Sequence, residues 1–151
     1  MDIRILHEST DKRVLNKLLE LHKEFDKQEK EASAGSVVDI LADYPGWFDD
    51  IEKCLDYDIV LGVFDSGELA GFATGCIAEG YSRKSLNISS LYIAEEHRRK
   101  GYGKALYKRI LTEAGDIKSV SLVAYTGNTG ALAFYKSIGL EIYAHYLGKE
   151  V

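Results

Sequence analysis

Apolar residues recur every three or four positions between residues 14 and 25, which predicts an amphipathic helix. Ser9 or Thr10 is expected to cap its first turn. A second, shorter helix is expected near Pro45, because proline suits the first turn of a helix and apolar residues follow at helical spacing. The apolar face of this helix would consist of Trp47, Phe48, Ile51 and Leu55. Residues 31–38 are predicted to form a loop between the two helices.

Elsewhere the apolar runs are mostly strand-sized. Strands are predicted at 2–7, 59–64, 68–78, 87–93, 119–125 and 140–151, the last as one strand or a pair, and helices at 101–114 and 128–138. Asp65-Ser66-Gly67 is a typical turn sequence, so the strands around it should form an antiparallel hairpin. Strand, helix and strand from 87 to 125 predict a right-handed βαβ unit with two parallel strands. The fold class expected is α/β (α+β), with a mixed, mostly antiparallel sheet, a central parallel βαβ crossover and about four flanking helices.

Length and composition fit a single domain spanning residues 1–151. The chain is 46% hydrophobic and 28% charged, and its net charge of −5 argues against general binding to nucleic acid. The apolar runs are too short to span a membrane, and the charged N-terminus does not resemble a secretory signal. Only Cys54 and Cys76 are present, without the spacing of metal ligands. We therefore expect a cytoplasmic protein with reduced thiols and no bound metal.

Positive charge is concentrated where the predicted strand at 87–93 leads into the helix at 101–114. The stretch 98–109 contains six Lys or Arg residues and no acid. Within it, Gly101 and Gly103 leave the backbone accessible at the helix start, where free N–H groups and the positive end of the helix dipole favour an anion. Together these features predict a phosphate-binding turn, whereas the charges alone would indicate only a solvated helix face.

Two common phosphate-binding motifs do not fit this turn. A dinucleotide-binding motif would need Gly or Ala at the position of Leu106. A P-loop would need a hydroxyl group for magnesium in place of Ala105, and a glycine in place of Arg98. The ligand is therefore predicted to be a small polyanion that is bound in another way.

A third pattern does fit. The motif Arg98-x-x-Gly101-x-Gly103 is followed by a second one in the last predicted helix. The second motif is Asn128-x-x-Ala131-x-x-Phe134-Tyr135-x-x-x-Gly139-Leu140. Both are similar to signatures of the GNAT superfamily of N-acetyltransferases, and the order of elements agrees over essentially the whole chain. The resemblance implies a GNAT-type fold and direct transfer of an acetyl group from acetyl-CoA to a primary amine, without a metal.

The resemblance also implies roles for individual residues. The main chain of one strand would pair with the pantetheine arm of acetyl-CoA, at Leu91, Tyr92 and Ile93. The pyrophosphate would be bound by Arg98, Arg99, Lys100, Gly101, Tyr102, Gly103 and Lys104. Asn128 would hydrogen-bond the pantetheine region, and Tyr135 would lie beside the thioester sulfur. Both residues also have a structural interpretation, Asn128 as a helix N-cap and Tyr135 as a core residue.

Acetyl transfer requires a neutral amine, a stabilised oxyanion and a proton for the departing thiolate. Tyr135 is the candidate general acid, because a phenol with an ordinary pKa of about 10 is suited to protonate a thiolate. The resemblance implies a main-chain N–H near Ile93 for the oxyanion. The glutamates that histone-type and ribosomal-protein-type relatives use as bases are replaced by Asn87 and Val123. Glu79 is the remaining candidate base, acting through a water molecule, or the amine enters already neutral.

The acceptor region implied by the resemblance spans roughly 33–56 and 143–146. Its first part carries acidic and aromatic residues: Asp39, Asp43, Tyr44, Trp47, Phe48, Asp49, Asp50 and Glu52. They would suit a cationic small-molecule or peptide amine, although the acids are equally typical of a solvated helix face. Because the family bases are absent, the alternative function is a non-catalytic acyl-CoA-binding regulatory domain. We expect no nucleic-acid or membrane partner, and a monomer or homodimer.

Overall fold

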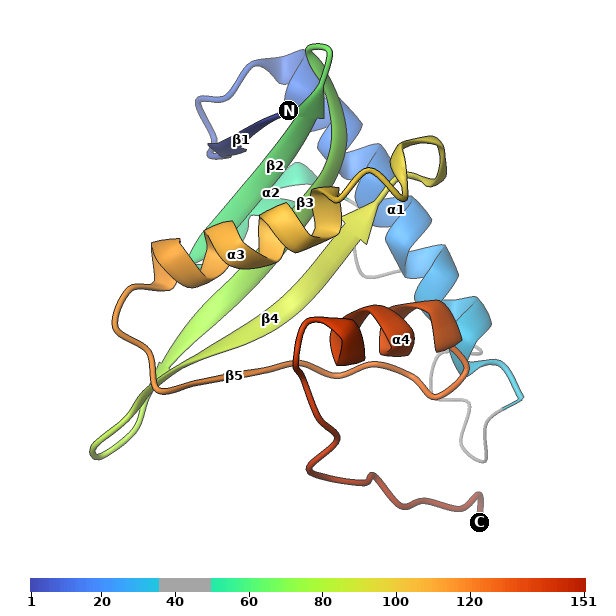
Figure 1. Ribbon diagram of the computed structural model, residues 1–151. Coiled ribbons are helices and arrows are strands. Elements are labelled where there is room, and N and C mark those ends of the chain that lie inside the picture. The colour runs from blue at the N-terminus through green and yellow to red at the C-terminus, as the bar shows by residue number, and fades with distance from the viewer. Residues whose placement is uncertain (36–49) are drawn as a thin grey trace.

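The computed structural model describes residues 1–35 and 50–151 and contains one five-stranded sheet (Figure 1). The strands are β1 (Asp2–Ile5), β2 (Ile59–Asp65), β3 (Glu68–Glu79), β4 (Lys84–Ile93) and β5 (Ser119–Ser121). They lie in sequence order, with the first four antiparallel and β5 parallel to β4. The predicted mixed, mostly antiparallel sheet with one parallel crossover is therefore confirmed.

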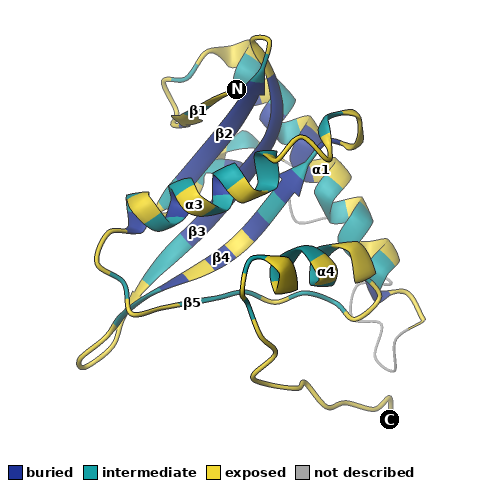
Figure 2. Ribbon diagram, in the orientation of Figure 1, coloured by how far each residue is buried: buried dark blue, intermediate teal, exposed yellow. Residues whose placement is uncertain are grey.

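Helices pack against both faces of this sheet. They are α1 (Lys12–Ser33), α2 (Ile51–Leu55), α3 (Tyr102–Ala114) and α4 (Thr129–Ser137), with a short 3₁₀ turn η1 (Glu95–His97) before α3. One apolar cluster joins α1 and α2 to the sheet and includes Phe72 and Tyr92, and a second joins α3 to the sheet and includes Leu106 and Ile110. Buried residues accordingly run along the middle strands in Figure 2. The two-sided packing explains why β2 and β3 are nearly continuous apolar runs.

The longest helix, α1, starts and ends later than the pattern predicted. Asp11 is its N-cap, not Ser9 or Thr10, because the Asp11 carboxylate accepts the N–H of Arg13 at 2.8 Å. Thr10 instead uses its hydroxyl to accept the N–H of His7. The helix runs to Ser33, into the segment predicted as a loop. Within residues 1–35 and 50–151, no helix combines the length and apolar character that crossing a bilayer requires.

The β2–β3 hairpin confirms the predicted turn. Ser66 and Gly67 have φ angles of 51° and 85°, and two adjacent residues in the left-handed region are typical of the tight turn that matches the twist of paired strands. Asp65 and Glu68 are paired across the turn. This hairpin brings Asp65 next to the loop before α3, as described below.

The predicted strand at 140–151 is wrong. No strand forms there, and its apolar side chains are exposed, among them Ile142, Tyr143, Tyr146 and Leu147 (Figure 2). Leu140, Ile142, Ala144 and Tyr146 do alternate with other residues as a strand would require, but the segment pairs with no strand of the sheet, so this pattern alone was misleading. β5 is likewise shorter than the predicted strand at 119–125. The position near Pro45 where the second helix was predicted to begin lies outside the described residues; within them, α2 begins at Ile51, with Asp50 as its N-cap.

His22 makes folding sensitive to acid. Its ring is fully buried and stacks on Phe72 with centroids 3.9 Å apart, and burial lowers the pKa of His22 from 6.5 to about 3. Below pH 6.5 His22 binds a proton in the unfolded chain but stays neutral in the folded protein. Each pH unit between 6.5 and about 3 should therefore lower the free energy of unfolding by about 1.4 kcal/mol through His22 alone. Urea unfolding from about pH 7 to about pH 4 should show a shallower pH dependence for His22→Leu. An identical slope in both proteins would contradict this prediction.

Candidate active site

The sheet opens between β4 and β5. The two strands pair only up to Asn87 and Ser121, and Figure 1 shows the chain after β5 turning away from β4. At the end of β4, Ala94 donates its N–H to β3 at 2.9 Å. Because main-chain groups alternate in direction along a strand, the N–H groups of Leu91 and Ile93 face away from β3, toward the opening. This part of β4 is a free strand edge on which an extended ligand could pair.

A cleft of about 520 Å³ lies along this edge. Its walls are the end of β4, the loop before α3, the first turn of α3, and α4. All the predicted cofactor-binding residues except Lys100 line it: Leu91, Tyr92, Ile93, Arg98, Arg99, Gly101, Tyr102, Gly103, Lys104, Asn128 and Tyr135. The structure therefore brings together residues from two separate sequence motifs around one cavity.

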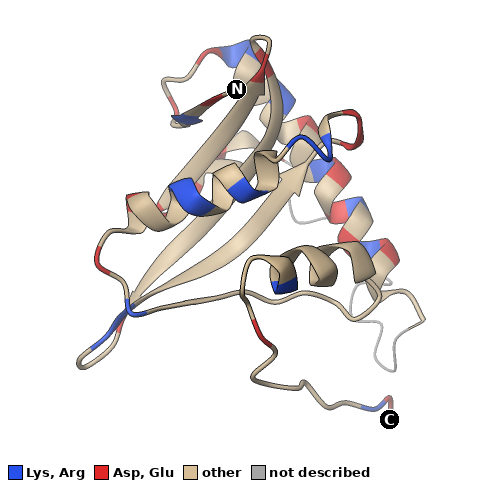
Figure 3. Cartoon of the chain, in the orientation of Figure 1, with Lys and Arg blue, Asp and Glu red and all other residues tan. Residues whose placement is uncertain are grey.

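The loop before α3 is a tight turn with free backbone donors. Arg99 and Gly101 have φ angles of 62° and 81°, both in the left-handed region. The first helical hydrogen bond joins the N–H of Ala105 to the carbonyl of Gly101 at 3.1 Å, so the N–H groups of residues 102–104 have no partner within the helix. Lys and Arg gather on this loop and on α3 (Figure 3). The turn has the donors and the charge that an anion requires.

Arg98 is held in place by contacts within the protein. Its Nε donates to the carbonyl of Ile93 at 2.9 Å, its Nη2 donates to Gln28 Oε1 at 2.9 Å, and the guanidinium lies 5.5 Å from the centre of the Tyr92 ring. Arg98 thus joins the end of β4 to α1 and lines the cleft. Arg98 is therefore held in the wall of the cleft by groups of the protein itself.

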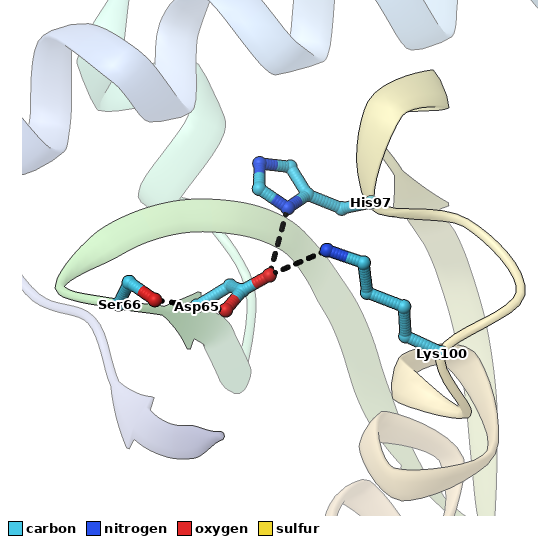
Figure 4. A network of polar contacts seen from close by, with 4 residues as sticks. All are labelled: Asp65, Ser66, His97 and Lys100. Atoms are coloured by element: carbon cyan, nitrogen blue, oxygen red, sulfur yellow. Dashed lines mark hydrogen bonds and ion pairs between the residues drawn. The ribbon is translucent and has the colours of Figure 1, made fainter.

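Lys100 faces the β2–β3 hairpin instead of the cleft (Figure 4). Its Nζ donates to Asp65 Oδ2 at 2.9 Å, and His97 Nδ1 lies 3.1 Å from the same oxygen. Hydrogen bonds from Lys100, Tyr102 and His97 hold the pKa of Asp65 well below its usual range. The network anchors the loop before α3 on both sides of Arg98 and Arg99, so the hairpin turn helps to position the wall of the cleft.

A second, smaller cavity of about 50 Å³ adjoins the cleft at the base of the β4–β5 opening. The two cavities share five lining residues: Gln28, Leu91, Asn128, Ala131 and Tyr135. Tyr135 therefore stands at their junction. Burial, with a smaller contribution from the charge of Glu29, raises the pKa of Tyr135 to about 12. The phenol keeps its proton at neutral pH, but it is a weaker acid than the ordinary tyrosine assumed from the sequence.

Asn128 has two side-chain contacts. Its Oδ1 accepts the N–H of Ala131 at 3.2 Å, so it is the N-cap of α4. Its Nδ2 donates to Glu29 Oε1 on α1 at 3.4 Å. The structural interpretation of Asn128 is thus confirmed, and the contact with a second element was not foreseen.

Glu79 is not brought to the site. It is exposed, pairs with Lys84 across the β3–β4 hairpin, and lines neither cavity. At the rise of a strand it lies roughly 30 Å along β4 from Ile93, so we do not retain it as a base. Asn87 bridges the strands instead, with its Nδ2 3.4 Å from Ser121 Oγ.

The predicted acceptor acids are mostly not described. Asp39, Asp43, Tyr44, Trp47, Phe48 and Asp49 lie outside the described residues. Asp50 is exposed and caps α2, since its carboxylate accepts the N–H of Lys53 at 2.9 Å. Glu52 is exposed in the first turn of α2. Over residues 1–35 and 50–151, no group of three or more His, Cys, Asp or Glu residues is arranged to hold a metal ion.

The residue that sequence reasoning missed is Glu29. It lines the small cavity together with Tyr135. A signal was present, because Glu29 follows Leu18 by eleven positions and Phe25 by four, which continues the apolar stripe of α1. A glutamate on the inward face of an amphipathic helix is unusual enough to mark a site.

The site thus combines an open strand edge, a cationic turn beside it and a tyrosine at the junction of two cavities. Residues 15–140 match the acetyltransferase (GNAT) family, and the chain belongs to this family. The membership suggested by the two sequence motifs is confirmed.

Known relatives agree with this class. The chain is 28% identical over 113 residues to N-acetyltransferase family 8 member 2 of Rattus norvegicus, covering 64% of this chain and about half (50%) of that relative's length. The fold of this chain is similar to that of a ribosomal-protein-alanine N-acetyltransferase from Brucella melitensis biovar Abortus 2308. The TM-score is 0.67, the sequences are 19% identical, and the match covers 99% of this chain and 98% of that chain.

The fold is also similar to those of two aminoglycoside acetyltransferases. One was solved in complex with CoA and has a TM-score of 0.68, 19% identity and coverage of 99% of this chain and 93% of that chain. The other, from an uncultured soil metagenomic sample, was solved in complex with sisomicin, with a TM-score of 0.66, 20% identity and coverage of 99% and 96%.

Proposed function

We propose that this acetyltransferase moves an acetyl group from acetyl-CoA directly to a primary amine. The observation that carries the proposal is the position of Tyr135 at the junction of the two cavities. The large cleft has room, cationic side chains and free backbone donors for a pyrophosphate and an extended arm. The small cavity beyond Tyr135 is where an acceptor nitrogen would meet the thioester.

The residues present fit acetyl-CoA. When bound, it would supply the activated acetyl group as a thioester. The outward N–H groups of Leu91 and Ile93 would pair with the extended arm and stabilise an oxyanion at the carbonyl. The N–H groups of residues 102–104, together with Arg99 and Lys104, would hold the pyrophosphate. The Tyr135 hydroxyl would give its proton to the departing sulfur.

We propose that the acceptor is a cationic primary amine, on the basis of the similar structures and of the site. The similar structures include two aminoglycoside acetyltransferases and a ribosomal-protein-alanine N-acetyltransferase. The primary amines of aminoglycosides and of proteins are cationic at neutral pH. We also propose that residues 1–151 form a single domain and that the protein is cytoplasmic.

Release of the CoA thiol from acetyl-CoA should depend on an added amine. We would measure initial rates with spermidine, sisomicin, a lysine-containing peptide and a peptide with an N-terminal alanine. At least one amine should raise thiol release well above the hydrolysis rate without acceptor. Binding of acetyl-CoA without release for any amine would instead favour the regulatory domain that binds acyl-CoA without catalysis.

A further inference from the structure

The proposed function leaves unexplained how the acceptor loses its proton. Glu29 is the sole carboxylate among the described residues that line either cavity. It lies in the penultimate turn of α1, and its Oε1 accepts a hydrogen bond from Asn128 at the start of α4. It is half-buried, so one side of the carboxylate is held by the protein while the group still lines the cavity.

The surrounding backbone fixes Glu29 near Tyr135. Gly127 packs so closely on the carbonyl of Ala32 that a Cβ atom at residue 127 would collide with it. This close approach joins the last turns of α1 to the loop that precedes α4. Glu29 and Tyr135 both line the small cavity, and Tyr135 lies on α4 seven residues after Asn128, which donates a hydrogen bond to Glu29. The pair is therefore held by contacts between two helices.

The environment also tunes Glu29. Burial raises its pKa above the ordinary value, the Asn128 hydrogen bond opposes this shift, and the charge of Asp26 adds to it. A carboxylate whose pKa is raised is a better proton acceptor at neutral pH. The other titratable group among the described residues of the small cavity is Tyr135, and the segments of β4 and of the chain after β5 contribute serine and apolar residues.

We propose that Glu29 is the catalytic base, which takes one proton from the ammonium group of the acceptor in the small cavity. This inference rests on the proposed function. The neutral nitrogen then attacks the thioester carbonyl, and the C–S bond breaks as the sulfur takes the Tyr135 proton. The new amide nitrogen returns its surplus proton to the Tyr135 oxygen. Glu29 releases its proton to solvent, so the cycle yields an amide, a free thiol and one proton.

The two residues assist each other in this sequence. While Glu29 is ionised, its charge contributes to the high pKa of Tyr135. Once Glu29 has accepted a proton, that contribution disappears, and the pKa of Tyr135 falls when the phenol must act as an acid. Deprotonation of the amine thus prepares the protonation of the leaving thiolate.

The cavity also restricts the acceptor. The small cavity, at about 50 Å³, has about one tenth of the volume of the cleft, at about 520 Å³. An unbranched aminomethyl end, –CH₂–NH₃⁺, fits this space, and its positive charge matches the single carboxylate. Secondary and α-branched amines should therefore have lower kcat/KM than the unbranched primary amine of equal length.

Glu29→Gln tests the base. It keeps the shape of the side chain and an oxygen for Asn128 but cannot accept a proton usefully. With acetyl-CoA and the panel amine of highest kcat/KM, we expect kcat near pH 7 to fall by about 100-fold. The loss should shrink as pH rises toward the pKa of the free amine, because the amine then enters neutral. Calorimetric affinity for acetyl-CoA should stay unchanged.

Two variants separate catalysis from structure. Glu20→Gln makes the same change on α1 at a side chain that is 65% exposed, and it should leave kcat and the pH profile unchanged. Glu29→Asp retains a carboxylate and should keep the wild-type shape of the profile at a lower kcat. A pH-independent loss in Glu29→Gln, or no loss, would overturn the base. If the wild type released no thiol with any amine, the proposed function itself would fail.

Discussion

Tyr135→Phe is expected to lower kcat by about 100-fold while leaving the affinity for acetyl-CoA nearly unchanged. The hydroxyl stands at the junction of the two cavities and keeps its proton at neutral pH, because burial raises the pKa of Tyr135 to about 12. Phenylalanine fills the same space but has no proton for the departing thiolate. Steady-state thiol release gives kcat, and calorimetry gives the affinity.

Tyr107→Phe is the matched control for this change. Tyr107 is a half-buried tyrosine that packs against the core under α3 and lines neither cavity. Its loss of a hydroxyl should leave kcat within about twofold of the wild type, as expected for a residue away from the chemistry. Turnover by Tyr135→Phe at the wild-type rate would remove Tyr135 from the mechanism.

Gly101→Val is expected to weaken acetyl-CoA binding by about tenfold or more. Gly101 has a φ angle of 81°, where a β-branched residue is strained by roughly 1–2 kcal/mol, and 1.4 kcal/mol corresponds to a factor of ten. Relief of the strain must move the turn whose N–H groups face the cleft. The affinity measured by calorimetry should fall, whereas kcat at saturating acetyl-CoA should change less.

Gly139→Val controls for the strain itself. Gly139 has a φ angle of 94° just after α4, an added Cβ meets nothing within 4 Å, and the residue lines neither cavity. Both valine variants should lose free energy of unfolding, but only Gly101→Val should lose affinity for acetyl-CoA. Equal affinity in the two variants would show that the turn does not hold the ligand.

The parts of the site that could be predicted from the sequence are those set by local spacing. Arg98, Gly101 and Gly103 fall within one turn, and Asn128 and Tyr135 within one helix, so each motif fixes its own geometry. In a βαβ unit the two strands are parallel, so the segments that follow them leave the sheet at the same edge. Because one motif follows the first strand and the other follows the second, the order of elements implies that the two motifs lie close together. The structure brings both to one cleft.

The parts that could not be predicted depend on contacts between distant segments. The hydrogen bond between Asn128 and Glu29 joins residues 99 positions apart, and that between Lys100 and Asp65 joins residues 35 apart. Sequence spacing carries no information on such pairs. For the same reason Glu79 looked available as a base, although the length of β4 separates it from the open strand edge.

Calorimetric titration of the wild-type chain with acetyl-CoA tests the central claim most directly, because every later step depends on that donor occupying the cleft. The account predicts saturable binding of one acetyl-CoA per chain, competition by free CoA, and an affinity that falls as salt concentration rises, since cationic groups at the loop before α3 contribute to binding. No saturable binding at low salt, where those charges act most strongly, would contradict it.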